Sequence, residues 1–185
     1  DPANAMTEQT APKMFSLMKQ YPSTSLIAHG TAVGLPPLQP GNSEAGHLTI
    51  GSGRIVKQDI TVVTDAITDG SFFQNPALIN GFQSAEKRKS KVHLIGLLTD
   101  NTSAHASPQH LYALVDMATR FDIGDIVLHL FTDGRDAPPH AARSYIHDLS
   151  EHLGDPRVSI ATVCGRYYGM NRNKQWDVTE QSFDL

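Results

Sequence analysis

Three apolar segments of strand length, separated from one another by helical patterns, dominate the second half of this chain. They cover residues 91–98, 125–131 and 158–164, and amphipathic helices are predicted over 111–121 and 141–153. Each segment is apolar on both faces and each connection is long enough for a crossover, which is typical of parallel strands covered by helices. The pattern therefore predicts an α/β fold that contains a βαβαβ unit with a parallel sheet.

The first half of the chain has a less regular pattern. Proline and glycine are concentrated between residues 30 and 41, which predicts a loop, and helical periodicity resumes at Ser43. A run of β-branched residues over 60–64 predicts a break in that helix near Lys57. The predicted elements are, in order, a helix over 11–21, a short strand over 25–29, the loop over 30–41, helical structure over 43–69 and a helix that begins at 75–76.

Charged side chains follow each of the three predicted strands. Ligands of parallel α/β sheets bind beyond the carboxyl ends of the strands, and these ends meet at one edge of the sheet. Arginine donors match carboxylate and phosphate oxygens in pairs, so we expect a small, doubly anionic guest. The candidate residues in these segments are His105, Arg135, Asp136, Arg166 and Arg172.

Among these candidates, Asp136 has a predicted chemical role. It follows Arg135 directly, so it is expected to stay ionised and to take or return a hydroxyl proton. Structural alternatives remain open from the pattern alone. Asp133 or Asp136 could cap the helix that follows the two prolines at 138–139, and Arg166 and Arg172 could be ordinary surface arginines.

Ser43 is the candidate nucleophile. It lies between Gly41 and Gly46 where the loop changes into a helical pattern, so an anion could be held there by free backbone N–H groups and the helix dipole. The alternative is an ordinary N-cap, because serine is among the preferred capping residues. Gly51 and Gly53 extend the glycine-rich stretch, which indicates close packing or close approach of a ligand.

Composition limits the classes of partner. The net charge is −4 and the pI is about 6.1, so we expect neither a nucleic-acid partner nor a membrane partner. A single cysteine, Cys164, predicts a reducing, cytoplasmic setting. Nine histidines show no HExxH or paired-cysteine spacing that would indicate a metal site.

Several motifs in one order resemble the cofactor-independent phosphoglycerate mutases. They are GNSEAGHL at 41–48, DGRDAPP at 133–139 and GRYY at 165–168, supported by AVGLP at 32–36 and DGSFF at 69–73. The likeness runs along nearly the whole chain.

The resemblance implies two partial domains. Residues 1–56 would belong to a partial phosphatase domain of the alkaline-phosphatase type that carries the nucleophilic serine. Residues 57–185 would form the N-terminal part of an inserted phosphotransferase domain that binds the substrate. The fold class implied is a parallel-sheet α/β transferase domain attached to a partial alkaline-phosphatase-like α/β domain, in a chain that is a fragment of the mutase.

The resemblance also implies the reaction and the residues for it. The reaction is the interconversion of 3-phosphoglycerate and 2-phosphoglycerate through a phosphoserine, in glycolysis and gluconeogenesis. Ser43 would be the nucleophile and a metal ligand. The residues that contact phosphoglycerate would be His105, Arg135, Asp136, Arg166 and Arg172, with Asp136 as the proton shuttle. Two divalent metal ions, Mn²⁺ or Mg²⁺, would be required, 2,3-bisphosphoglycerate would not, and the enzyme would be a cytoplasmic monomer.

The chain departs from the family pattern in two places. The loop that carries His105 is one residue longer, and Ser107 stands where the family has a second histidine. Asn171 and Asn173 replace two carboxylates, and Gln175 stands where an arginine is common. The remaining metal ligands and a further arginine pair of the family have no counterpart here, so we expect the chain alone to lack mutase activity.

Two other functions compete with this interpretation. One is a different phosphatase, or a phosphopentomutase, of the alkaline-phosphatase superfamily, which would not need all the charged residues that follow the strands. The other is a catalytically silent protein that binds phosphate esters through its arginines without using Ser43.

Overall fold

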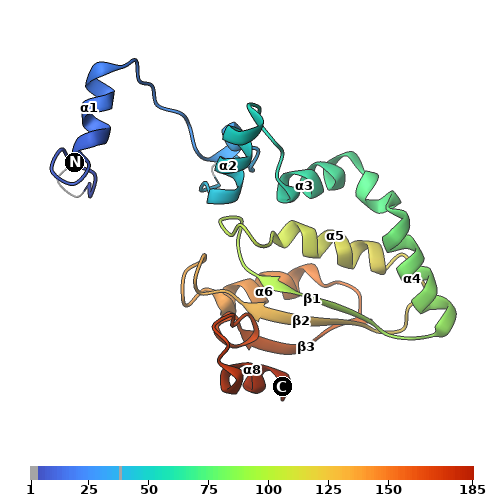
Figure 1. Cartoon of the computed structure of the whole chain (residues 1–185). Coiled ribbons are helices and arrows are strands. Elements are labelled where there is room, and N and C mark those ends of the chain that lie inside the picture. The colour runs from blue at the N-terminus through green and yellow to red at the C-terminus, as the bar shows by residue number, and fades with distance from the viewer. Residues whose placement is uncertain (1–3, 38) are drawn as a thin grey trace.

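The computed structural model describes residues 4–37 and 39–185, which contain a three-stranded sheet with helices packed on it and a first helix that lies apart from the sheet (Figure 1). None of the helices in this part of the chain has both the length and the apolar character needed to cross a bilayer. The elements are α1 (Pro12–Gln20), η1 (Gly30–Val33), α2 (Ser43–Ser52), α3 (Asp59–Asp69), η2 (Ser71–Gln74), α4 (Pro76–Arg88), β1 (Val92–Leu98), α5 (Pro108–Ala118), β2 (Ile126–Thr132), α6 (Ala142–His152), β3 (Val158–Gly165), α7 (Arg166–Gly169) and α8 (Trp176–Phe183).

The sheet is parallel, as predicted, and its strand order is β1-β2-β3. Val92 is opposite Ile126, which in turn is opposite Val158. One irregularity in the pairing of β2 with β3 follows Leu128. Helices α5 and α6 are the crossovers, so the predicted βαβαβ unit is confirmed and the carboxyl ends of all three strands lie at one edge.

Helices α5 and α6 pack on the same face of the sheet. Leu128 and Leu130 of β2 are 0% and 1% exposed and pack with Val115 of α5 and Leu149 of α6. Full burial of such a side chain contributes about 1.5–3 kcal/mol. This layer holds the strands rigid beneath the loops at the carboxyl edge.

The link between α2 and α3 depends on a glycine. A Cβ on Gly34, whose φ is 77°, would lie 1.9 Å from the carbonyl oxygen of Val56. The Gly34 carbonyl accepts hydrogen bonds from the Gln58 N–H at 2.9 Å and from Thr61 Oγ1 at 2.8 Å. The helix break predicted near Lys57 is therefore confirmed, and it extends over residues 53–58.

Three predictions about secondary structure need correction. The strand predicted over 25–29 is wrong, because Leu26 and Ile27 are 77% and 65% exposed and no described strand lies beside them to pair with. Helix α5 begins at Pro108 rather than at residue 111, because proline fits the first turn of a helix. The short helices α7 and α8 were not predicted, since too few turns are present to show a periodicity.

Candidate active site

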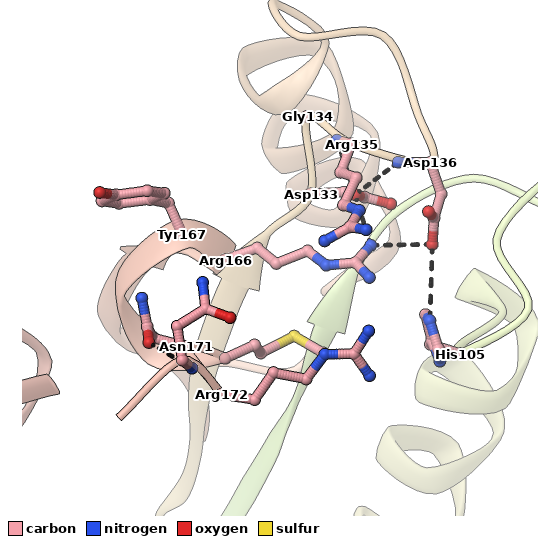
Figure 2. Close-up of a pocket in the computed structure, with 11 residues that line it drawn as sticks. His105, Asp133, Gly134, Arg135, Asp136, Arg166, Tyr167, Asn171 and Arg172 are labelled. Atoms are coloured by element: carbon pink, nitrogen blue, oxygen red, sulfur yellow. Dashed lines mark hydrogen bonds and ion pairs between the residues drawn. The ribbon is translucent and has the colours of Figure 1, made fainter. Parts of the chain in front are cut away.

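The five charged residues predicted to meet at the carboxyl edge line one cavity of about 600 Å³, which we call the arginine cavity (Figure 2). Figure 2 shows the side chains of Arg135, Arg166 and Arg172 directed toward the same space, with His105 opposite them. The cavity is lined by His105, Asp133, Gly134, Arg135, Asp136, Arg166, Tyr167, Met170, Asn171, Arg172 and Asn173. The predicted convergence of these side chains is confirmed, whereas their contact with phosphoglycerate stays a prediction.

Asp133 organises the loop that follows β2. Its side chain is fully buried, and its Oδ1 accepts the backbone N–H groups of Arg135 at 2.9 Å and Asp136 at 3.0 Å. Thr99 Oγ1 donates to its Oδ2 at 2.6 Å. Burial alone would raise the pKa of Asp133, but these hydrogen bonds and one from Arg166 outweigh it and lower the pKa to about 2. Asp133 is therefore a permanent anion that shapes the loop.

The alternative in which one of these aspartates caps the following helix is wrong. Helix α6 begins only at Ala142, and its N-cap position, Ala141, receives no side-chain hydrogen bond. Both carboxylates instead face the sheet edge, where Asp133 accepts from the loop backbone and Asp136 from Arg166 and Ser103.

Arg166 connects the two carboxylates. Its Nη1 donates to Asp133 Oδ1 at 2.9 Å and to Asp136 Oδ2 at 2.8 Å, and the arginine side chain is only 12% exposed. It is therefore not a surface arginine. Its hydrogen bond is the main reason that the pKa of Asp136 lies below the usual range, with burial opposing the shift and Ser103 assisting it. Asp136 is thus ionised in the protein without substrate.

Arg135 and Arg172 present a different environment. Both side chains belong to exposed residues, and within 4–37 and 39–185 neither has a carboxylate within ion-pair distance. Their guanidinium groups are directed into the arginine cavity (Figure 2). The donors of both groups are therefore available to an anion.

The residues near Arg172 that depart from the family pattern, Asn171, Asn173 and Gln175, hydrogen-bond to one another. The Asn173 N–H donates to Asn171 Oδ1 at 2.9 Å, and Asn171 Nδ2 donates to Gln175 Oε1 at 3.1 Å. These neutral contacts order the segment without placing a carboxylate beside the Arg172 guanidinium. The departure from the family pattern is thus compatible with the position of Arg172 at the cavity.

His105 lies on the loop after β1, with Nε2 3.9 Å from Asp136 Oδ2. The start of this loop is held by Asp100, which accepts the Tyr145 hydroxyl at 2.8 Å. Burial and this hydrogen bond raise the pKa of Tyr145 to about 12, so the phenol remains a donor. The later part of the loop after β1 is held by Ser103, whose Oγ accepts the His105 N–H at 3.2 Å.

Ser43 is the first residue of α2 and is exposed. Asn42 precedes it as the N-cap, with its side chain accepting the Ala45 N–H at 2.9 Å, so the alternative in which Ser43 caps the helix is wrong. The Ser43 hydroxyl is left free of that task. A Cβ on Gly41 would lie 1.8 Å from a carbonyl oxygen of Ala28, which explains this glycine by backbone packing.

Ser43 is not among the residues that line the arginine cavity. Its neighbours Asn42 and Glu44 line a second cavity of about 280 Å³, together with Ala104. Because Ala104 precedes His105 directly, one loop runs between the two cavities. That loop therefore contributes His105 to the arginine cavity and Ala104 to the cavity beside Ser43.

Two buried polar residues beside the site were not predicted. Gln39 and Ser103 are 2% and 0% exposed, and the Gln39 amide donates to the Ser103 carbonyl at 2.7 Å. The pattern of residue types in the sequence does not indicate this contact, because both residues are polar and lie in segments that are predicted to be loops. Only the packing of those loops shows that they are buried.

The described residues do not form a complete metal site. No group of three or more histidine, cysteine, aspartate or glutamate side chains is close enough to hold a cation in this part of the chain. Ser43 offers a single hydroxyl oxygen, whereas divalent Mn²⁺ and Mg²⁺ require several oxygen ligands. By themselves, the described residues therefore offer too few ligands for such an ion.

The chain is similar to known proteins both in sequence and in structure. The family model described as "BPG-independent PGAM N-terminus" matches residues 63–185. A 2,3-bisphosphoglycerate-independent phosphoglycerate mutase of Clostridium novyi is 43% identical over 182 residues, which cover 98% of this chain and 35% of that protein. The enzyme of the same name from Gloeothece citriformis is 44% identical over 183 residues, with 98% and 34% covered.

The fold is also similar to that of a solved structure. A crystal structure of Leishmania mexicana phosphoglycerate mutase, determined at low cobalt concentration, superposes with a TM-score of 0.78 at 30% identity. The match covers 94% of this chain and 33% of the Leishmania chain. The chain thus spans about a third of the length of the proteins that it matches.

Proposed function

The chain belongs to the family of 2,3-bisphosphoglycerate-independent phosphoglycerate mutases, and we propose that the protein that contains it catalyses the interconversion of 3-phosphoglycerate and 2-phosphoglycerate. The observation that carries the proposal is the convergence of three guanidinium groups on one cavity. A phosphoglycerate has one carboxylate and one phosphate, and both groups accept paired hydrogen bonds from arginine.

In this proposal, Arg135 and Arg172 bind the anionic groups and Arg166 orients the reacting end of the substrate. Arg166 is already fixed by two carboxylates, so it provides a rigid donor, whereas the other two arginines have donors to spare. Fixed donors lower the barrier to phosphoryl transfer because they need no reorganisation during the reaction. His105 approaches from the opposite side (Figure 2) and would contact the substrate there.

Asp136 is proposed to move the proton of the glycerate hydroxyls. Its low pKa makes it a weak base while Arg166 donates to it. An anion bound at Arg166 adds negative charge beside the carboxylate, which raises its pKa and strengthens it as a base. Proton transfer is therefore favoured when the substrate is present.

Ser43 is proposed to accept the phosphoryl group and to return it to the other hydroxyl of the glycerate. The exposed position at the first turn of α2 supports this role, because backbone N–H groups at a helix start favour an anion. We also propose that two divalent cations, Mn²⁺ or Mg²⁺, act in the whole enzyme, which we place in the cytoplasm. Ser43 would supply one ligand oxygen, and the other ligands would come from other segments of the whole enzyme.

The test uses the full-length protein that contains this chain, with Mn²⁺ present and enolase coupled to the formation of 2-phosphoglycerate. Ser43→Ala should lower turnover by at least about 1,000-fold, because the covalent intermediate cannot form. Mass spectrometry should find phosphate on Ser43 of the wild-type protein after mixing with substrate. Ser52→Ala is the matched control, since the hydroxyl of Ser52 at the end of α2 bonds, within the part of the chain that the structure describes, only to the backbone carbonyls of Thr49 and Arg54.

The outcomes separate the competing functions. Turnover of pentose phosphates but not of phosphoglycerates would identify a phosphopentomutase or phosphatase. Binding of phosphoglycerate with no turnover, no phosphate on Ser43 and no effect of Ser43→Ala would identify a silent binding protein. Retained mutase activity in the alanine variant would show that the nucleophile is a different residue.

A further inference from the structure

A buried glutamine connects the nucleophile segment to the arginine cavity. Gln39 precedes the GNSEAGHL motif, is 2% exposed, and donates from Nε2 to the Ser103 carbonyl oxygen at 2.7 Å. Its own backbone is held as well, because its carbonyl accepts the Gly30 N–H at 3.0 Å and its N–H donates to Pro36 at 3.2 Å. The side chain therefore spans from a fixed loop to the loop after β1.

Ser103 continues the connection. It is 0% exposed, and its Oγ donates to Asp136 Oδ2 at 3.0 Å while accepting the His105 N–H at 3.2 Å. The same Asp136 oxygen accepts Arg166 Nη1 at 2.8 Å. A continuous series of hydrogen bonds thus runs from Gln39 through Ser103 to the charged groups of the cavity.

Packing alone does not explain why a glutamine occupies position 39. The Oε1 atom of Gln39 is buried without a hydrogen-bond partner among the residues that the structure describes. Burying an unpaired amide oxygen is unfavourable, whereas the hydrogen bond from Nε2 satisfies the Ser103 carbonyl, which an apolar side chain of the same size would leave without this donor. The residue type is explained by the contact that Nε2 makes.

We infer that Gln39 and Ser103 are positioning residues that fix the Ser43 segment relative to the arginine cavity. This inference rests on the proposed function, in which a phosphoryl group passes between Ser43 and a substrate held by the arginines. A misplacement of about 1 Å between reacting groups can lower a rate by roughly 100-fold. Neither Gln39 nor Ser103 lines either cavity, so they act through the residues that they hold.

The test replaces Gln39 by methionine in the full-length protein, which keeps the length of the side chain and removes the amide. We expect Gln39→Met to lower kcat by roughly 10- to 100-fold and to change the Kd for 3-phosphoglycerate by less than about threefold. Hydrogen exchange of the β2 amides should be unchanged, whereas the Gly30 and Ala45 amides should exchange faster. Gln20→Met is the control for the substitution itself, because Gln20 lies on the exposed face of α1.

Ser103→Ala tests the second half of the connection. It removes the hydroxyl bonded to Asp136 and keeps the carbonyl that Gln39 contacts, and it should also lower kcat. The double variant should lose little more than the worse single variant, because both act through one connection. Fully additive losses would overturn the inference.

Gln39→Glu gives a pH signature that a purely structural role would not produce. The carboxylate repels the Ser103 carbonyl, whereas the protonated acid donates to it as the amide does. The ratio of its kcat to that of the wild type should therefore rise as the pH falls from about 8 to about 6, since burial raises the pKa of a carboxyl group.

The inference and the proposed function fail in different ways. If the wild-type protein interconverts phosphoglycerates and Gln39→Met does so at the same kcat, only the inference is overturned. If the wild-type protein has no mutase activity, the proposed function fails, and exchange at Gly30 and Ala45 decides whether Gln39 holds the segment. Unchanged exchange there overturns the inference in either case.

Discussion

The two edges of the sheet use arginine in opposite ways. At the amino edge, Arg157 directly precedes β3 and its donors are all taken by the protein. Its Nη1 donates to the carbonyls of Phe121 at 2.8 Å and Ile123 at 3.2 Å, and its Nη2 donates to Thr119 at 2.7 Å. Its Nε and Nη2 also pair with Asp155. This arginine holds the end of α5 and the turn into β2.

At the carboxyl edge, Arg135 and Arg172 face the arginine cavity with no carboxylate in reach within 4–37 and 39–185. Arg166 lies between these extremes, because two carboxylates hold it and yet it lines the cavity. The difference shows that donors left unused by the fold, rather than the presence of arginine, indicate a place for an anion.

The largest effect is expected from Arg157→Met. The variant removes the arginine donors from three carbonyl groups that follow α5, of which Phe121 keeps the Ile123 N–H, and it leaves Asp155 without its ion-pair partner. Hydrogen-exchange protection of the β2 amides should fall by roughly 100-fold, since each lost charged hydrogen bond weakens local stability. The measurement is amide exchange by mass spectrometry in the full-length protein.

Arg143→Met is the control for this variant, because Arg143 is exposed on α6. The Kd for phosphoglycerate should stay the same in both variants. A weakened affinity in Arg157→Met, at unchanged protection, would contradict the division between the two edges.

The next effect concerns pH and the buried carboxylate at the carboxyl edge. The pKa of Asp133 is lowered from 3.8 to about 2, so the folded form gains stability that is complete well above 3.8 and is lost as the pH falls toward 2. The full shift corresponds to at most about 2.4 kcal/mol, and water in the adjacent cavity reduces this to roughly 1–2 kcal/mol.

Asp133→Asn removes this titration while keeping an oxygen for the backbone N–H groups of the loop. The difference in protection of the 133–136 amides between wild type and variant should therefore shrink as the pH falls from about 5 to about 2. If the difference in amide protection stays constant over this pH range, the charge of Asp133 does not stabilise the loop and only its hydrogen-bonding geometry does.

Much of the architecture could be predicted from the sequence because its causes are local. The run from Ile126 to Leu130 is apolar at every position but one, which only a strand covered by a helical layer can accommodate. The same reasoning fails for Leu26 and Ile27, which are apolar but have no strand beside them. An apolar run indicates a strand only where a neighbour exists.

The convergence of the charged residues could also be predicted, because parallel strands end at one edge. The role of Asp133 could not be predicted, since it depends on Thr99, which follows a different strand. Gln39 and Ser103 were missed for the same reason, because their contact joins loops that are distant in the sequence. Pairing between loops leaves no periodic pattern.

The smallest effect is expected at the arginines whose donors face the cavity, and it tests directly whether the two edges of the sheet use arginine differently. Arg172→Met should weaken phosphoglycerate binding by roughly 10-fold, the value of one exposed charged hydrogen bond. Protection of the β2 amides should not change, because Arg172 contacts no carboxylate among the described residues. Arg172→Lys should recover only part of the affinity, since an ammonium group cannot make the paired contact. Loss of protection in Arg172→Met, measured beside Arg157→Met, would show that both edges use arginine for structure.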